Sequence, residues 1–300
     1  MTDILTVRYA QTGKSTAPNN MGMREMQARA YEKRDAQYLL IKAPPASGKS
    51  RALMFIALDK LFKQGLKKVI IAVPEMSIGG SFKDTDLTSH GFFADWKVDP
   101  RYNLCTPGNE GKVDRVIEFL EDPSARALIC THATFRFAYD RAGSARKFNQ
   151  TLVAIDEFHH ASAEEGNILG GIVSDLMARS TAHIVAMTGS YFRGDAVPIL
   201  TPEDEAKFTQ VTYTYYEQLN GYKYLKSLGI GYHFYQGRYF DALKEVLDVT
   251  KKTIIHIPNV NSMESTGQKL DEVDRIMDVI GDVQGQDPET GIYRVKTRSG

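Results

Sequence analysis

The sequence has 300 residues, of which 42% are hydrophobic and 25% are charged, so it can form one large domain or two ordinary ones with a sizeable core. Basic and acidic residues both number 37, and this zero net charge gives no general support to a nucleic-acid partner, which would need a local basic patch. The start of the chain lacks a secretion-signal core, and no apolar run reaches about 18 residues. These features exclude a membrane partner and predict a cytoplasmic protein.

Short apolar runs and helical patterns alternate along the first two-thirds of the chain. The apolar runs predict buried strands at 37–43, 67–74, 126–132, 151–157 and 183–190. Apolar residues at helical spacing predict helices at 21–34, 50–65, 112–121 and 170–179. This alternation is typical of an α/β domain with a mainly parallel sheet.

The character of the sequence changes after Ser190. We expect an N-terminal arm at 1–20, a first domain at 21–210 and a tyrosine-rich connecting segment at 211–240. A second α/β unit begins at 241–300, with a helix at 241–250, a buried strand at 251–258 and a helix at 265–281. This last part is too short for a full domain of the same kind, so it predicts an incomplete one.

The string "APPASGKS" at 43–50 has the features of a phosphate-binding loop, whose pattern is G-x-x-x-x-G-K-S/T. A predicted strand precedes it and a predicted helix follows, so backbone N–H groups and the helix dipole would face an anion. Ala43 replaces the usual first glycine, and Pro44 favours an extended backbone there that alanine tolerates. The residues predicted to hold ATP phosphates are Ala46, Ser47, Gly48, Lys49 and Ser50.

A second string, "TGKST" at 12–16, lacks this context. Arg8 stands in place of its first glycine, and "TAPNN" follows where a helix should begin. We interpret it as part of a mobile arm.

Two adjacent acids end a predicted strand in "TLVAIDEFHH" at 151–160. Ligands bind at the carboxyl ends of parallel strands, so we expect Asp156 to hold Mg²⁺ through water, together with Ser50. Glu157 is then placed to orient and deprotonate an attacking water. Alone, such an acid pair is more typical of a solvated helix start, but the phosphate loop upstream favours catalysis by Lys49, Asp156 and Glu157.

The strings "APPASGKS", "DEFH" and "MTGS", in this order, resemble motifs I, II and III of superfamily 2 helicases and translocases. Motif II has the DExH form, and the style is nearest to the DEAD/DEAH-box-like ATPase modules of restriction-enzyme motor subunits. The resemblance covers about residues 20–260 and implies a RecA-like P-loop NTPase domain, followed by an incomplete second RecA-like domain. It also implies ATP and Mg²⁺ as cofactors and nucleic acid as partner, with DNA favoured over RNA.

The same resemblance suggests ligand contacts outside the phosphate loop. Gln27, in "MREMQARA", matches a glutamine that reads the adenine edge, although a lone helical glutamine is usually a surface residue. Pro74 and Ser77, in "VPEMSIGGSF", and Thr131, in "CTHATF", match positions that hold nucleic-acid phosphates. Such contacts fix position without reading sequence, and the ordinary alternative is a helix cap or strand-end turn.

Three further residues are implied to couple the two ligands. Thr188 and Ser190, in "TGS", would link the γ-phosphate to the nucleic-acid side, with His159 as intermediary. The stretch 251–262 resembles motif IV, the first strand of the second motor domain.

One expected element of the family is missing. No Q-x-x-G-R-x-x-R string, which would carry an arginine finger, occurs after residue 250, and "YQGRYF" at 235–240 precedes the motif IV strand. Because such an arginine contributes about 10³-fold or more to related reactions, we expect these residues to bind ATP–Mg²⁺ but hydrolyse it slowly. The rest of a motor, or a partner, would supply the arginine, and the sequence is expected to be a fragment or a shortened relative.

Two other interpretations stay open. The chain is alternatively a small-molecule kinase or another P-loop NTPase, or it is a nucleotide-gated interaction module without turnover that docks through 211–240.

Overall fold

The computed structural model of the chain describes residues 4–106, 111–158, 168–189, 200–234, 236, 239–248, 250–251, 253–256, 269–288 and 290–297. They form two compact units, one of residues Tyr9–Lys226 and one that joins Met1–Arg8 to Ser227–Gly300. No helix among these residues is long and apolar enough to span a membrane.

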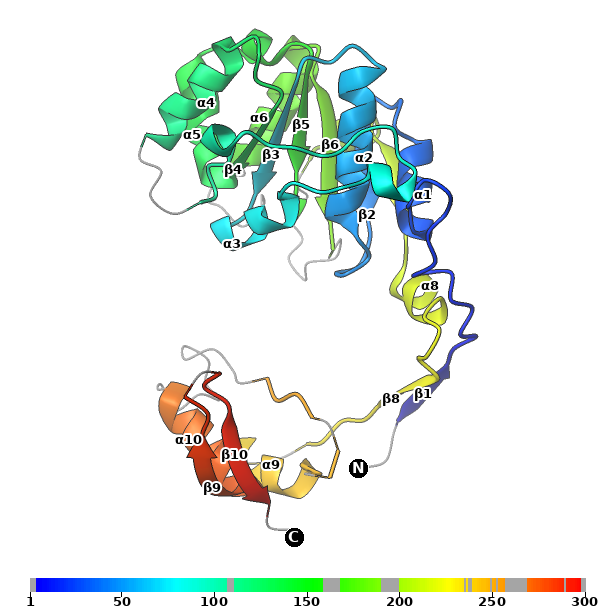
Figure 1. Cartoon of the computed structure of the whole chain (residues 1–300), viewed down its shortest axis with the longest axis vertical. Helices are drawn as coiled ribbons and strands as arrows, with labels where there is room; N and C mark the ends of the chain where they lie inside the picture. Colours follow the sequence, from blue (N-terminus) through cyan, green and yellow to red (C-terminus); the bar gives the residue numbers. More distant parts are fainter. Residues whose placement is uncertain are drawn as a thin grey trace. The chain divides into compact units, whose positions relative to one another are not determined.

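The larger unit is built on a six-stranded parallel sheet (Figure 1). Its strands are β2 (Tyr38–Lys42), β3 (Lys68–Val73), β4 (Ala127–Thr131), β5 (Thr151–Ile155), β6 (His183–Thr188) and β7 (Thr209–Thr212). They lie in the order β4-β3-β5-β6-β2-β7, and every pairing is parallel. The predicted α/β architecture with a mainly parallel sheet and its five strands are thus confirmed, and β7 is an additional edge strand.

Helices cover both faces of this sheet, which explains why strands β2 to β6 are largely apolar. The described helices of this unit are α1 (Glu25–Glu32), α2 (Lys49–Phe62), α3 (Met76–Gly79), α4 (Lys112–Glu121), α5 (His132–Ala142), α6 (Ile168–Arg179), α7 (Pro202–Glu205) and α8 (Tyr215–Asn220), of which α1, α2, α4, α5 and α6 pack on the sheet. The described buried hydrophobic residues form two clusters. One cluster contains residues of α1 and α2, and the other contains residues of α4, α5 and α6. Figure 1 shows these two groups on opposite faces of the sheet.

Two helix starts matter for the site because residues beside them carry the predicted ligand contacts. The residue before α2 is Gly48, in the left-handed conformation with φ 91°. The residue before α5 is Thr131, whose hydroxyl accepts a hydrogen bond from the N–H of Thr134 (3.2 Å). Each cap places its helix start at the carboxyl end of a strand.

The segment that contains "TGKST" is anchored, in contrast to the predicted mobile arm. The buried hydroxyl of Ser15 donates to the carbonyl of Gln218 (2.7 Å) and lies 2.9 Å from the hydroxyl of Tyr213. The N–H of Ala10 donates to the side chain of Asn220 (2.7 Å). Ser15 therefore satisfies a carbonyl at the end of α8, where helix carbonyls lack intrahelical partners.

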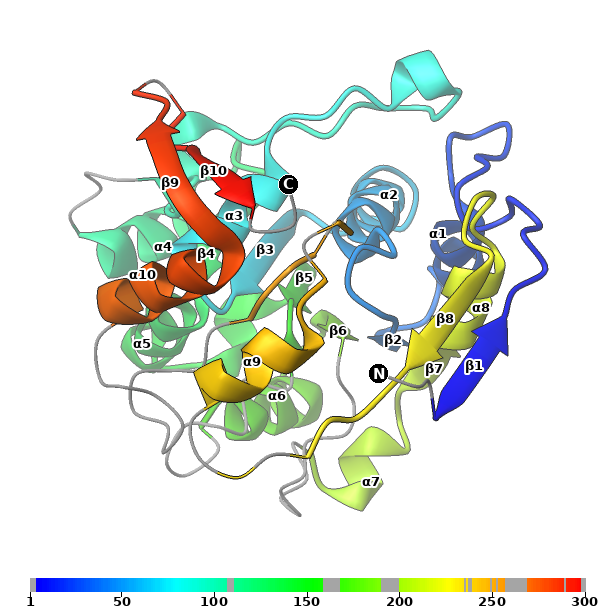
Figure 2. The same ribbon diagram turned by 90° about the horizontal axis from the view of Figure 1, so that it is seen from below.

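The smaller unit contains two antiparallel strand pairs and two helices. Its elements are β1 (Leu5–Arg8), β8 (Ser227–Ile230), α9 (Tyr239–Val246), α10 (Lys269–Ile280), β9 (Gly281–Gln286) and β10 (Tyr293–Thr297). Strand β1 pairs with β8, as Figure 2 shows, and β9 pairs with β10. The two predicted helices are confirmed within a few residues.

The buried strand predicted at 251–258 is wrong for the part of it that the structure describes. Residues 251 and 253–256 form no strand, and Ile254 is 99% exposed. A buried parallel strand needs neighbours in a parallel sheet, and the described residues of this unit form only antiparallel pairs.

A buried lysine at the amino end of the sheet predicts a measurable pH dependence. Lys60 is fully buried, and its ammonium donates to the carbonyl of Ala36 (2.9 Å) and lies 2.9 Å from Nδ1 of His183. Burial lowers the pKa of Lys60 to about 8. The unfolded chain therefore binds more protons between this value and the lysine's ordinary pKa, and the free energy of unfolding should rise with pH in that interval.

We expect Lys60→Met to remove this component, which is on the order of 2 kcal/mol between pH 7 and pH 10. Urea unfolding of both proteins across that range measures it. Parallel pH profiles for the variant and the wild type would contradict the assignment.

Candidate functional site

The predicted nucleotide residues meet at the carboxyl ends of three strands. Strand β2 leads into the 43–50 loop, β5 leads into Asp156 and Glu157, and β6 leads into Gly189. Because β6 lies between β5 and β2, its end separates the loop from the acid pair. This edge is where open parallel sheets bind ligands.

The loop takes its special backbone conformations at positions other than the replaced glycine. Ala46 has φ 60° and Gly48 has φ 91°, whereas Ala43 is not among the described residues with positive φ. The N–H of Ala43 instead donates to the carbonyl of Thr188 at the end of β6 (3.0 Å). Alanine is therefore tolerated at 43, as predicted from the extended backbone before Pro44.

Several polar groups of the loop are arranged to receive an anion. Ser47 is 6% exposed, and its hydroxyl has no hydrogen-bond partner among the described residues, which is costly for a buried group. The first N–H groups of α2 point out of the helix start and carry its positive dipole end. The ammonium of Lys49 donates to the carbonyl of Ala43 (3.2 Å).

The acid pair lies opposite this loop in a constrained turn. Oε1 of Glu157 is 3.4 Å from Nζ of Lys49, and Oε2 accepts from the N–H of Gly189 (3.1 Å). Glu157 has φ 47°, a left-handed conformation that costs a residue with a long side chain about 1–3 kcal/mol. The surrounding contacts hold this carboxylate toward the loop.

Asp156 is a buried carboxylate at the end of β5. It is 4% exposed, and its N–H donates to the carbonyl of Ala72 in β3 (2.9 Å). Burial and the neighbouring Glu157 carboxylate raise the pKa of Asp156 to about 6. A cation beside it would favour ionisation, and the oxygens of Asp156 and Ser50 are ligands of the type that Mg²⁺ prefers, so these residues fit the predicted metal.

Gln27 lies in a cavity of about 340 Å³ next to the loop, together with Arg24, Gly48, Arg51 and His90. Its side chain braces this region: Oε1 accepts from the N–H of Arg24 (2.8 Å), and Nε2 donates to the carbonyl of Gly48 (3.2 Å). The predicted adenine contact would be made from this braced position. Arg24, Arg51 and His90 were not predicted as site residues. Arg24 and Arg51 each lie close in sequence to a predicted residue, whereas no pattern in the sequence points to His90.

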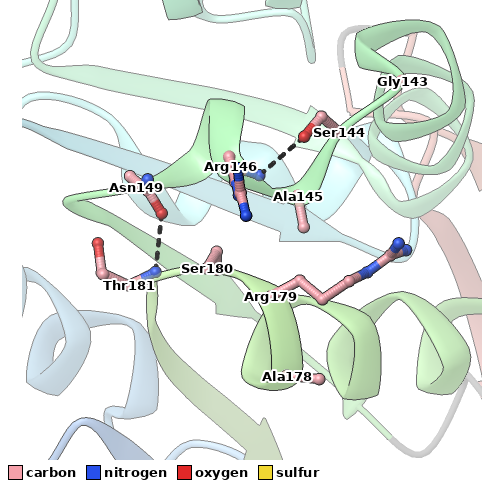
Figure 3. Close-up of a pocket in the computed structure, with 9 residues that line it drawn as sticks. All are labelled: Gly143, Ser144, Ala145, Arg146, Asn149, Ala178, Arg179, Ser180 and Thr181. Atoms are coloured by element: carbon pink, nitrogen blue, oxygen red, sulfur yellow. Dashed lines mark hydrogen bonds between the residues drawn. The ribbon is translucent and has the colours of Figure 1, made fainter.

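A larger cavity of about 610 Å³ lies at the amino ends of β5 and β6 (Figure 3). Arg146 and Arg179 line it, and the N–H of Thr181 donates to the side chain of Asn149 (2.8 Å). The described lining includes none of the predicted site residues, so this cavity is separate from the nucleotide site.

The predicted nucleic-acid residues lie at the same sheet edge, beyond the acid pair. Pro74 and the exposed Ser77 follow β3, and Thr131 ends β4. The Thr131 hydroxyl caps α5 and lies 3.0 Å from the hydroxyl of Thr134. These positions are compatible with phosphate contacts, which stay a prediction.

Of the three predicted coupling residues, only Thr188 is among the residues that the structure describes. Thr188 is buried at the end of β6, and its carbonyl accepts from the loop. His159 and Ser190 lie outside the described residues. Gly189, which was not among the predicted site residues, donates a hydrogen bond from its N–H to Glu157, and a Cβ there would lie 3.2 Å from Nζ of Lys49.

No protein-family model matches the chain. Over 299 residues, 100% of the chain, it is 62% identical to a protein of Bacillus subtilis (strain 168) named "Putative ATP-dependent helicase YeeB". The chain is a homologue of YeeB. It spans about half of that protein, 50% of its length. The homology to YeeB confirms the predicted resemblance to helicases.

Two solved structures are also similar. One is the Pyrococcus furiosus Hef helicase domain, at 17% identity and a TM-score of 0.44, covering 63% of this chain and 38% of that one. The other is the UvsW helicase of bacteriophage T4, at 15% identity and a TM-score of 0.41, covering 69% of this chain and 63% of that one.

Replacing Gly48 with alanine is expected to weaken ATP binding about tenfold or more. A Cβ at this position would lie 2.4 Å from Nε2 of Gln27, and its φ is left-handed. The side chain would displace Gln27 and tilt the start of α2, which shifts the phosphate donors. Titration with a fluorescent ATP analogue measures the affinity.

Gly65→Ala is the matched control. Gly65 has φ 78°, but a Cβ added there would have no neighbour within 4 Å, so its replacement introduces similar backbone strain without crowding. Both variants should lose stability, and only Gly48→Ala should lose ATP affinity. Equal ATP affinities in the two variants would contradict the role of this loop.

Proposed function

We propose that the chain is the ATP-binding part of a nucleic-acid-dependent ATPase, a helicase or translocase that hydrolyses ATP to ADP and phosphate with Mg²⁺. The observation that carries this proposal is the contact between Lys49 and Glu157 across the end of β6 (3.4 Å). It brings a phosphate-binding lysine and a candidate base to the same point. The printed name of the relative, "Putative ATP-dependent helicase YeeB", supports the same activity.

The geometry suggests the order of events at the phosphate. The loop N–H groups and the dipole of α2 hold the phosphates, and Lys49 turns from Glu157 to the β- and γ-phosphates. This exchange frees a Glu157 oxygen to accept the proton of the attacking water while Gly189 keeps the carboxylate oriented. Ser50 and Asp156 would hold Mg²⁺, which supplies charge neutralisation at the phosphate oxygens.

Nucleic acid is the proposed partner on the other half of the same sheet edge. Pro74, Ser77 and Thr131 would contact its phosphates, and the preference for DNA over RNA rests on the motif resemblance. Thr188, Ser190 and His159 would relay between the two ligands, as the resemblance implies. An arginine from elsewhere in the motor, or from a partner, would complete the site.

The domain assignment belongs to the same proposal. The unit Tyr9–Lys226 would be the first RecA-like domain, and residues 241–300 would begin the second. The protein would act in the cytoplasm.

Filter binding and phosphate release test the proposal together. The chain is incubated with single-stranded DNA, double-stranded DNA or RNA, with and without Mg²⁺–ATP. We expect ATP-dependent retention of nucleic acid and slow phosphate release that nucleic acid accelerates. Phosphoryl transfer to a small molecule without any effect of nucleic acid would instead indicate a kinase, and nucleotide binding without turnover would indicate an interaction module.

A further inference from the structure

The peptide bond between Asp156 and Glu157 is held from both sides. Its carbonyl, that of Asp156, lies 3.0 Å from Nε2 of His132, a buried contact in which the ring N–H donates. Its N–H, that of Glu157, donates to Oδ1 of Asp156 (3.0 Å). The orientation of this peptide plane is therefore set by one histidine and one carboxylate.

The orientation of this peptide matters because the torsion angle that follows it, φ of Glu157, has a strained, positive value. Glu157 has φ 47°, and φ measures rotation about the bond that joins this peptide to the Glu157 α-carbon. Turning the peptide over would let Glu157 return to a negative φ and would aim its side chain elsewhere. The hydrogen bond from His132 opposes that turn.

His132 itself belongs to a different part of the site. It is the first residue of α5, it is 6% exposed, and it directly follows Thr131 at the end of β4. The first turn of α5 is fixed by the cap between Thr131 and Thr134. A ligand that moved the Thr131 cap would thus move the histidine that holds the catalytic turn.

We propose that His132 is a positioning residue that keeps Glu157 in its catalytic orientation and links it to the strand-end threonine, Thr131. This inference rests on the proposed ATPase function. His132 does not touch the reacting atoms and acts through the 156–157 peptide. Its loss should affect the hydrolysis step and its stimulation by nucleic acid, and it should leave ATP affinity nearly unchanged, because the loop N–H groups and Lys49, rather than the 156–157 peptide, would hold the phosphates.

The test compares His132→Ala with His132→Gln, whose side-chain amide can donate to the same carbonyl. We expect His132→Ala to lower the single-turnover rate of ATP hydrolysis about tenfold or more, with the ATP dissociation constant unchanged within about twofold. His132→Gln should recover most of the rate. Stimulation by nucleic acid should be lost in the alanine variant.

His183→Gln is the matched control. His183 is a partly buried histidine at the start of β6, and it contacts Lys60 rather than the 156–157 peptide. The variant should lose stability without changing the hydrolysis rate. A normal hydrolysis rate and normal stimulation in His132→Ala would overturn the inference.

A structural readout separates this inference from the proposed function. Crystal structures of wild type and His132→Ala should show the 156–157 peptide turned over in the variant and Glu157 at negative φ. An unchanged peptide would overturn the role of His132 whether or not the chain hydrolyses ATP. Absence of hydrolysis in the wild type, with a turned peptide in the variant, would count against the proposed function alone.

Discussion

Glu157→Gln is expected to lower the rate of ATP hydrolysis by about 10²–10⁴-fold while ATP still binds. The amide of glutamine can still accept the hydrogen bond from the N–H of Gly189, so the turn should stay in place. It cannot accept a proton from water. Because Glu157 is paired with Lys49 in the structure, the variant also frees this lysine, and ATP affinity should be equal to or higher than that of the wild type.

Single-turnover hydrolysis and equilibrium binding of an ATP analogue measure the two effects separately. Glu121→Gln is the control, because Glu121 is an exposed acid whose ion pair with Lys147 is 3.9 Å long. A Glu157→Gln variant that hydrolysed ATP at the wild-type rate would remove Glu157 from its role as the base.

Lys49→Ala is expected to reduce ATP affinity by about 2–5 kcal/mol, a loss of roughly 30-fold or more. The variant loses the ammonium that would neutralise the phosphates. It also leaves Glu157 without its lysine beside the buried Asp156, so two carboxylates would repel the incoming phosphates in a poorly solvated site.

Isothermal titration with Mg²⁺–ATP measures this loss, and Lys67→Ala, which removes an exposed lysine between α2 and β3, is the control. Combining Lys49→Ala with Glu157→Gln should restore part of the affinity, because the repulsive carboxylate is gone. Wild-type affinity in Lys49→Ala would place the phosphates at another site.

The sheet could be predicted from the sequence because its strands are buried on both faces. Residues 69–73 and 152–155 are fully buried, and such strands appear as unbroken apolar runs. Strand β7 was missed because only Val211 of its four residues is buried. The pairing of β1 with β8 joins residues more than 200 positions apart, which no local pattern indicates.

At 251–258, by contrast, a strand was predicted where the described residues form none. Its apolar run is as convincing as those of the larger unit, yet its described residues form no strand. An apolar run alone does not supply the neighbouring strands that a parallel strand needs.

The sequence predicted which residues lie near one another in the site, but not how their side chains and peptide groups are oriented. Parallel strands bring their carboxyl ends to one edge, so Lys49, Asp156 and Glu157 could be expected near one another. That Gly189 bonds Glu157 follows from the position of β6 between β5 and β2. The contact of His132 with the carbonyl of Asp156 depends on the direction of one peptide plane. The sequence of residue types does not indicate that direction.

The most direct test of the nucleotide site is a crystal structure of the chain with Mg²⁺ and a non-hydrolysable ATP analogue. We expect phosphates against the N–H groups of residues 46–50, Mg²⁺ beside Ser50 and Asp156, and Lys49 moved from Glu157 to the phosphates. Phosphates bound at residues 12–16 or in the cavity beside Arg146, with the pair between Lys49 and Glu157 intact, would contradict it.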